Sequence, residues 1–62
     1  MRELLQALKA FGFEVEDFSE GYNILYDNYL VATIDEKTYK YSLYKNVNGL
    51  RALLDEYIEE ED

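Results

Sequence analysis

The sequence of 62 residues contains no cysteine, histidine, tryptophan or proline. Without cysteine the chain can form neither a disulfide nor a thiolate metal site, and a reducing cell interior is its natural setting. Without histidine it lacks the usual general base near neutral pH and the commonest metal ligand. The chain is also too short for a deep cleft, and no nucleophile or phosphate-binding motif stands out. We therefore expect a protein that is not an enzyme and that binds no cofactor and no metal.

Long apolar runs are absent as well. No stretch approaches the about 20 apolar residues that a membrane-spanning helix needs. Charged residues, among them Arg2, Glu3 and Lys9, interrupt the apolar positions at the start of the chain, which argues against a signal peptide. These absences predict a soluble, cytoplasmic protein without a membrane partner.

Basic residues are few. Six of them stand against fourteen acidic residues, which gives a net charge of −8. Lysine and arginine supply most of the affinity for phosphate groups, so the sequence argues against direct binding to nucleic acid or anionic membrane. It favours a basic protein partner instead. The length predicts one domain, residues 1–62, of modest stability, because so small a domain buries only about 60% of its unfolded surface.

Strand-forming residues are concentrated in the middle of the chain. Residues 22–27, 29–34 and 39–44 are rich in Tyr, Ile, Leu, Val and Thr and are separated by turn formers, which predicts an antiparallel meander. Residues 13–17 alternate apolar with acidic side chains and predict a preceding strand, joined by a three-residue loop over 19–21. We expect a four-stranded sheet, with a three-stranded sheet as the alternative.

Two amphipathic helices flank these strands. The first is expected over residues 2–11, and Gly12 follows it where a left-handed cap is expected. Its apolar positions are Leu4, Leu5, Leu8 and Phe11. The second begins after an N-cap at Asn46 or Asn48. Its apolar positions are Val47, Leu50, Leu53, Leu54, Tyr57 and Ile58. The acidic residues 59–62 lie at the negative end of the helix dipole, which predicts a frayed tail. The fold class is therefore α+β, in the order α-β-β-β-β-α, with both helices on one face of the sheet.

The turns predict how the strands pair. Asp27 and Asn28 both tolerate positive φ and suit a two-residue type I′ turn. This turn pairs Tyr26 with Tyr29, Leu25 with Leu30 and Ile24 with Val31. A turn over residues 35–38 pairs Ile34 with Tyr39, Ala32 with Tyr41 and Leu30 with Leu43. The first loop pairs Phe18 with Tyr22, Glu16 with Ile24 and Val15 with Leu25.

Strict alternation along these strands sorts the side chains into two faces. The core face beneath the helices carries Phe13, Val15, Leu25, Leu30, Ala32, Ile34, Tyr39, Tyr41 and Leu43. The other face, here called the tyrosine face, carries Glu14, Glu16, Phe18, Tyr22, Ile24, Tyr26, Tyr29, Val31, Thr33, Lys40, Ser42 and Tyr44. Monomers seldom expose so much aromatic area, and tyrosine is enriched at interfaces. A half-exposed sheet also suits tyrosine without any partner.

These faces predict a non-catalytic module that docks on a basic protein surface. The residues expected to make contact are Glu14, Glu16, Asp17, Glu20, Tyr22, Ile24, Tyr26, Asp27, Tyr29, Val31 and Tyr44. In its most specific form the protein is a nucleic-acid mimic, an inhibitor of phage or mobile-element type, whose carboxylates replace phosphates and compete for a nucleic-acid-binding protein. Small acidic phage proteins that block host defence resemble this chain in size and charge. The alternative is a structural homodimer that associates through the tyrosine face, with a twofold axis near Ile24 and Val31.

Overall fold

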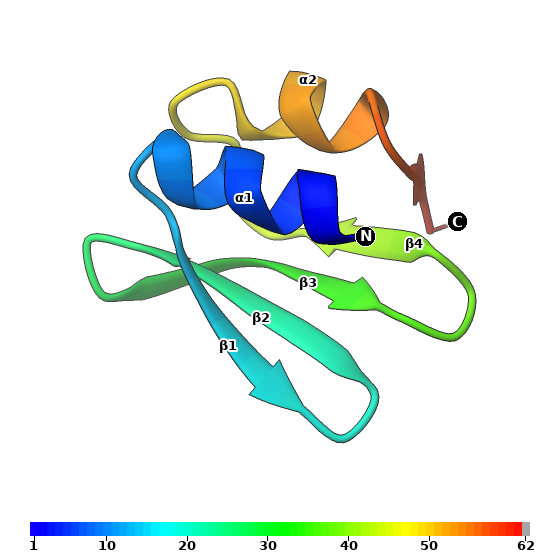
Figure 1. The fold of residues 1–62 in the computed structure, drawn as a ribbon. Helices are drawn as coiled ribbons and strands as arrows, with labels where there is room; N and C mark the ends of the chain where they lie inside the picture. Colours follow the sequence, from blue (N-terminus) through cyan, green and yellow to red (C-terminus); the bar gives the residue numbers. More distant parts are fainter. Residues whose placement is uncertain (62) are drawn as a thin grey trace.

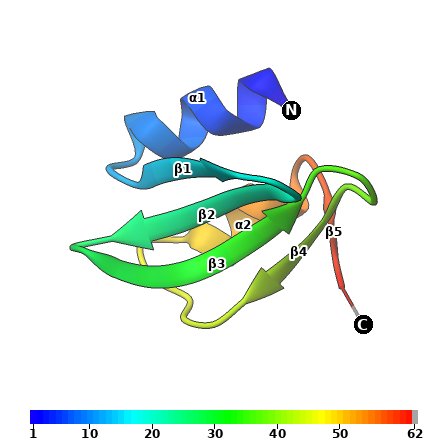
Figure 2. The same ribbon diagram turned by 90° about the horizontal axis from the view of Figure 1, so that it is seen from below.

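The computed structural model describes residues 1–61 and confirms an α+β fold (Figure 1). Its elements are α1 (Arg2–Ala10), β1 (Glu14–Phe18), β2 (Gly21–Tyr26), β3 (Tyr29–Asp35), β4 (Lys40–Leu43), α2 (Leu50–Asp55) and β5 (Glu59–Glu60). The strand order is β1-β2-β3-β4-β5. The first four strands form the antiparallel meander that the sequence predicts, and β5 adds a fifth strand parallel to β4. Both helices lie on one face, and Figure 2 shows the uncovered face.

Helix α1 packs on the sheet through a narrow apolar stripe. Leu4 and Leu8 are buried, one turn apart, as the helical spacing predicts. The helix ends at Ala10, and Gly12 follows with φ +93°, the left-handed conformation expected there. Phe11, predicted to be part of the core, is half exposed, and Phe13 takes that place after the chain has turned towards β1.

The turn between β2 and β3 forms as predicted. Asp27 and Asn28 have φ values of 53° and 68°, as a type I′ turn requires. The two pairs nearest the turn are confirmed: Tyr26 with Tyr29 and Leu25 with Leu30. The next pair is not, because the register shifts between Leu25 and Ile24.

Val31 is the extra residue of this β-bulge. Ile24 lies opposite Ala32 rather than Val31, so Val31 and Ala32 both turn towards the helices and both are buried. The Val31 carbonyl oxygen is satisfied from the end of β4, since it accepts the N–H groups of Tyr44 at 2.8 Å and Lys45 at 3.1 Å. Strict alternation cannot describe a strand with such an insertion: Ala32 and Ile34 after the bulge keep their predicted face, whereas Leu30 before it and the side chains of β2 lie on the face opposite to the predicted one.

The β1–β2 hairpin is one residue tighter than predicted. Phe18 pairs with Gly21 across a two-residue turn, so Val15 lies opposite Ile24 and Asp17 opposite Tyr22. Gly21 is the first residue of β2, and β3 passes close to it. A Cβ atom on Gly21 would overlap the carbonyl oxygen of Ile34.

The β3–β4 pairing differs from the prediction by two residues. Ile34 lies opposite Tyr41, and Ala32 opposite Leu43. The turn has the expected four residues but lies one position later, over residues 36–39, where the Asp35 carboxylate accepts the N–H groups of residues 37 and 38 and Tyr39 adopts φ 56°. A shift of two residues preserves the face of each side chain, so Ala32, Ile34, Tyr41 and Leu43 point towards the helices as predicted. Tyr39 does not, and it is exposed.

Helix α2 is shorter than its apolar pattern suggests. It follows Gly49, and its Leu50, Leu53 and Leu54 are buried. Neither predicted N-cap caps the helix by a side-chain hydrogen bond in the usual position. Asn46 instead accepts the N–H of Arg51 at 3.0 Å, and the Asn48 amide donates to the Phe11 carbonyl oxygen at 2.8 Å. The second contact ties the loop before α2 to the end of α1.

The acidic end of the chain lies along β4. Glu59–Glu60 forms β5 where the sequence predicts a frayed tail, and Asp62 lies outside the described residues. The backbone N–H of Glu61 donates to the Tyr41 carbonyl oxygen at 2.8 Å. Arg51 pairs with Glu60 at 2.8 Å. Backbone pairing and this ion pair oppose the electrostatic effect on which the prediction of fraying depends.

Candidate protein-interaction surface

The tyrosine face does not form as a single exposed surface. Ile24 and Val31 are 0% and 1% exposed and belong to the core between the sheet and the helices. Tyr22 and Tyr26 pack partly buried against the same core, and the Tyr26 ring lies 5.1 Å from that of Phe13. The bulge and the tighter hairpin are the physical causes, since each moves these side chains to the helix side. A dimer centred on Ile24 and Val31 is incompatible with their burial.

Residues predicted for the core occupy the uncovered face instead. Leu30 is 46% exposed, and Leu25 lies opposite it at the end of the hairpin. Tyr29 and Tyr44, both predicted to be in contact with a partner, are exposed. Tyr29 is the first residue of β3, and Tyr44 directly follows the end of β4. These side chains do not continue across the middle of the uncovered face. Asn23, Thr33 and Ser42 lie there side by side.

The acidic residues predicted for binding are all exposed. Glu14, Glu16 and Asp17 lie on β1, at one margin of the sheet, while Glu20 and Asp27 lie in the two turns that flank β2. Successive residues alternate in direction, so Glu14, Glu16 and Phe18 form one row on the uncovered side, with alternate residues about 6.6 Å apart. Phe18 is 40% exposed and gives this row an aromatic end.

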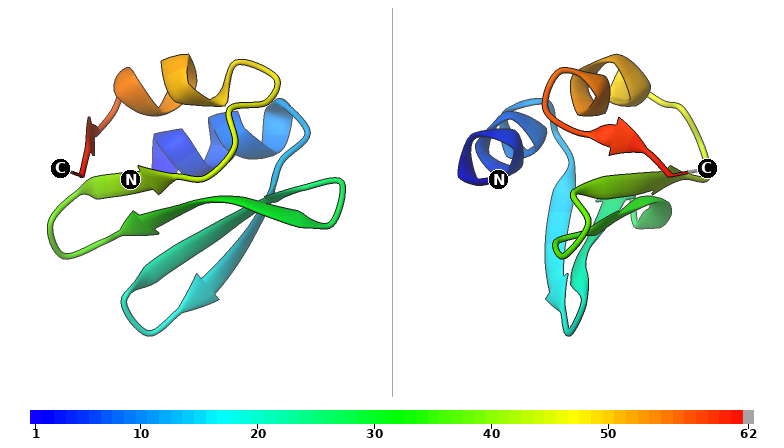
Figure 3. Two further views of the ribbon diagram at one scale, coloured as in Figure 1. Left: turned by 180° about the vertical axis from the view of Figure 1, so that it is seen from behind. Right: turned by 90° about the vertical axis from the view of Figure 1, so that its right-hand side faces the viewer.

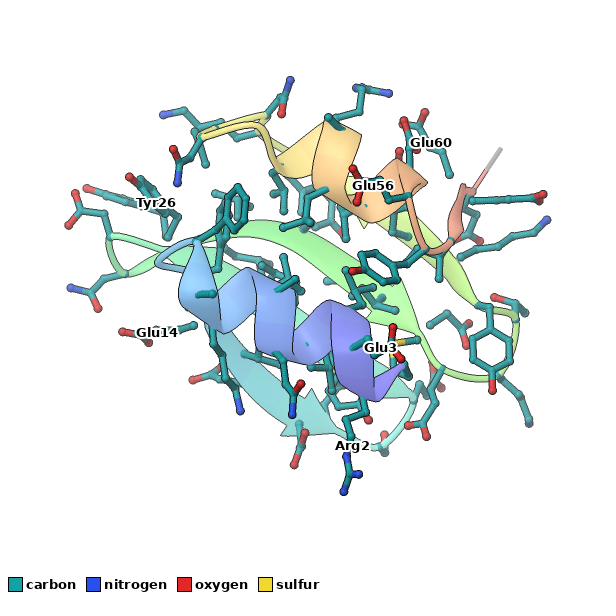
Figure 4. The ribbon with its side chains drawn as sticks, turned by 45° about the horizontal axis from the view of Figure 1, so that its top comes forward. Arg2, Glu3, Glu14, Tyr26, Glu56 and Glu60 are labelled. Atoms are coloured by element: carbon teal, nitrogen blue, oxygen red, sulfur yellow. The ribbon has the colours of Figure 1, made fainter. Side chains whose placement is uncertain are left out.

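None of these carboxylates forms an ion pair within the described residues. Across residues 1–61, Arg51–Glu60 is the only ion pair, although the sequence has fourteen acidic residues. Figure 4 shows Glu14 projecting outward beside α1, with Arg2 at the opposite end of that helix and Glu60 beyond α2. Within residues 1–61, no ion pair therefore compensates the negative charge of the row on β1. Partial burial, followed by the charges of Glu36 and Asp17, raises the pKa of Tyr22.

Tyr41 makes a contact that the sequence does not predict. Its ring is fully buried between β4 and α2, and its hydroxyl donates a hydrogen bond to the Asp55 carboxylate at the end of α2. Burial, reinforced by this hydrogen bond, raises the pKa of Tyr41 to about 12. The contact fixes α2 over β4 rather than forming a reactive site, because the ring is closed off from solvent.

This raised pKa predicts a loss of stability in alkali. Unfolded Tyr41 ionises near pH 10 and folded Tyr41 near pH 12, so above pH 10 the folded state binds more protons than the unfolded state. The contribution of Tyr41 to the free energy of unfolding should be constant below pH 10 and be lost progressively as the pH rises to 12. Urea unfolding at a series of pH values measures this, and Tyr41→Phe should show a smaller fall. An equal fall in both proteins would contradict the burial of this hydroxyl.

Comparison of the chain with protein-family models, with curated proteins and with solved structures finds no match. Over residues 1–61, no helix is long and apolar enough to cross a membrane. The same part of the chain contains no group of three or more acidic residues placed to hold a metal ion.

Proposed function

We propose that this protein is a non-catalytic module that binds a basic surface of another protein. The observation that supports this most directly is the row of exposed carboxylates on β1, Glu14 and Glu16 with Asp17 beside them, which no basic side chain neutralises within the described chain. Such a surface attracts a positive partner over a distance of about 10 Å at ordinary salt concentration. It also repels nucleic acid and anionic lipid.

Phe18 completes this surface as an aromatic anchor. It lies at the end of the row formed by Glu14 and Glu16, and it replaces the tyrosines that the sequence suggested for this role. Interfaces commonly combine such an aromatic contact with polar groups around it, because charge guides association while buried aromatic area slows dissociation. A nucleic-acid mimic, cytoplasmic and directed at a nucleic-acid-binding protein, is the most specific form of the proposal. Its distinguishing property is that added nucleic acid displaces the module from the partner.

The proposal predicts that binding depends on the position of the charges and not only on their number. The binding variant carries Glu14→Gln, Glu16→Gln and Asp17→Asn. The control variant, with the same net charge, carries Glu3→Gln, Glu36→Gln and Glu56→Gln. Partners are captured from a lysate of the source organism at low salt, identified, purified and titrated against all three proteins. We expect the binding variant to bind at least about tenfold more weakly than the control.

Two outcomes would contradict the proposal. One is that no basic protein is captured at low salt. The other is that the two variants bind the purified partner equally well, which would reduce the interaction to non-specific attraction by net charge.

A further inference from the structure

We propose that the free edge of β1 accepts an extended segment of the partner as an additional strand, in which basic and apolar residues alternate. This inference rests on the proposed function and specifies how the partner binds. It concerns the backbone of β1 as well as its carboxylates, and so it can fail while the proposed function holds.

The sheet has an open edge at β1. β1 is the first strand in the sheet and pairs only with β2. In the right-hand view of Figure 3, the lower part of β1 forms the margin of the molecule below α1, and no described element other than β2 lies beside it. An edge of this kind presents unpaired N–H and C=O groups that another chain can use.

Hairpin geometry indicates which groups these are. Phe18 and Gly21 close a two-residue turn, so they form a hydrogen-bonded pair, and Glu16 with Asn23 forms the next. The residues between them direct their backbone groups away from β2. Val15 and Asp17 are therefore the two residues whose N–H and C=O groups are available to an added strand.

The charge of β1 selects between occupants of this edge. A second copy of β1 would place its own Glu14, Glu16 and Asp17 against those of the first, and facing like charges destabilise a strand pair. A strand with lysine or arginine on the uncovered side would instead place a cation against Glu14 and Glu16. The same carboxylates thus oppose self-association and favour a basic strand.

A hollow lies on the helix side of the hairpin. Met1, Leu5 and Tyr22 contribute apolar area to it, between α1 and β2, and Arg2 and Lys9 lie at its border. Tyr22 lies opposite Asp17 in the sheet, so the hollow adjoins the free edge. Residues of an added strand that point to this side would meet apolar surface, the two cations and the Asp17 carboxylate, whose opposite charges offset one another. This arrangement favours apolar residues at the alternate positions.

The test uses a short capped peptide of the length of β1 in which lysine and valine alternate. The ¹⁵N-labelled protein is titrated with it at low salt, and amide hydrogen exchange is measured by NMR. We expect the amides of Val15 and Asp17 to exchange at least about tenfold more slowly in the complex, while those of Glu14 and Glu16 change little. Binding that protects neither Val15 nor Asp17, protection at Glu59–Glu60 instead, or no binding at all would overturn strand addition.

Two matched controls separate backbone pairing from charge attraction. Two peptides with N-methyl groups on alternate residues keep every charge. The peptide methylated on the backbone edge that faces β1 should lose its affinity for the protein, whereas the peptide methylated on the opposite edge should keep it. The variant E14K/E16K is altered only at exposed positions. It should lose its affinity for the lysine–valine peptide and bind a glutamate–valine peptide instead. Equal binding of both methylated peptides would refute strand addition. The proposed function would still be judged separately, by the affinities of the two charge-matched variants for the captured partner.

Discussion

Of the glycine-to-alanine substitutions in this protein, Gly21→Ala should cause the largest loss of stability. The new Cβ atom would overlap the Ile34 carbonyl oxygen and would also come within 3.0 Å of the backbone nitrogen of Glu36. Both obstacles are backbone atoms of the neighbouring segment, so no side chain can move aside. Relief requires β2 and β3 to separate where Tyr22 lies opposite Ile34. We expect a loss of about 3 kcal/mol or more, which combines overpacking with broken strand pairing.

A domain of this size has little stability in reserve, so Gly21→Ala should be largely unfolded at room temperature. Gly49→Ala is the matched control, because a Cβ atom there meets nothing within 4 Å and only the left-handed backbone, φ +74°, opposes the change. That variant should lose about 1–2 kcal/mol. Circular dichroism shows how much of Gly21→Ala is folded, and urea unfolding measures the loss in Gly49→Ala. If the two variants lost the same amount, the close passage of β3 over Gly21 would be wrong.

Ile24→Ala should cost far more than Leu30→Ala. Ile24 is fully buried between the sheet and the helices, and truncation of such a side chain removes its transfer free energy and leaves a cavity, a loss of about 2–5 kcal/mol. Leu30 is 46% exposed on the uncovered face, and its truncation should cost less than about 1 kcal/mol. Ile24→Val, expected to lose about 0.5–1.5 kcal/mol, provides a milder measurement if the alanine variant does not fold.

The order of these two losses distinguishes the observed register from strict alternation. Without the bulge, Ile24 would lie on the uncovered face and Leu30 beneath the helices, and Leu30→Ala would be the more damaging change. Thermal or urea unfolding of the purified variants gives the order directly. A larger loss for Leu30 would mean that the face assignment of β2 and β3 is reversed.

Local features of the fold could be predicted from the sequence. The α1 stripe, the turn at Asp27–Asn28 and the four-strand meander each follow from neighbouring residues, through helical spacing or positive φ. The bulge at Val31 could not be predicted in this way. Its cause is the return of the chain after β4, where two N–H groups reach the Val31 carbonyl oxygen. A contact between segments more than ten residues apart leaves no local pattern in the sequence.

The candidate surface was predictable in its charged part and not in its aromatic part. Glu14, Glu16 and Asp17 are exposed because the desolvation of a carboxylate without a partner is unfavourable wherever the strand faces. Tyrosine suits either environment, so the placement of Tyr22 and Tyr26 depended entirely on a register that two turns alone did not determine. The contact between Tyr41 and Asp55 likewise joins distant segments, and no local pattern around either residue predicts it.

The salt dependence of binding tests whether the carboxylates of β1 hold a basic partner. The dissociation constant for the purified partner is measured over a range of salt concentrations for the native protein and for the two charge-matched variants. We expect the affinity of the native protein to fall steeply with salt. Neutralising Glu14, Glu16 and Asp17 should flatten this dependence, whereas neutralising Glu3, Glu36 and Glu56 should leave it nearly unchanged. Parallel salt dependences for all three proteins would contradict binding through the carboxylates of β1.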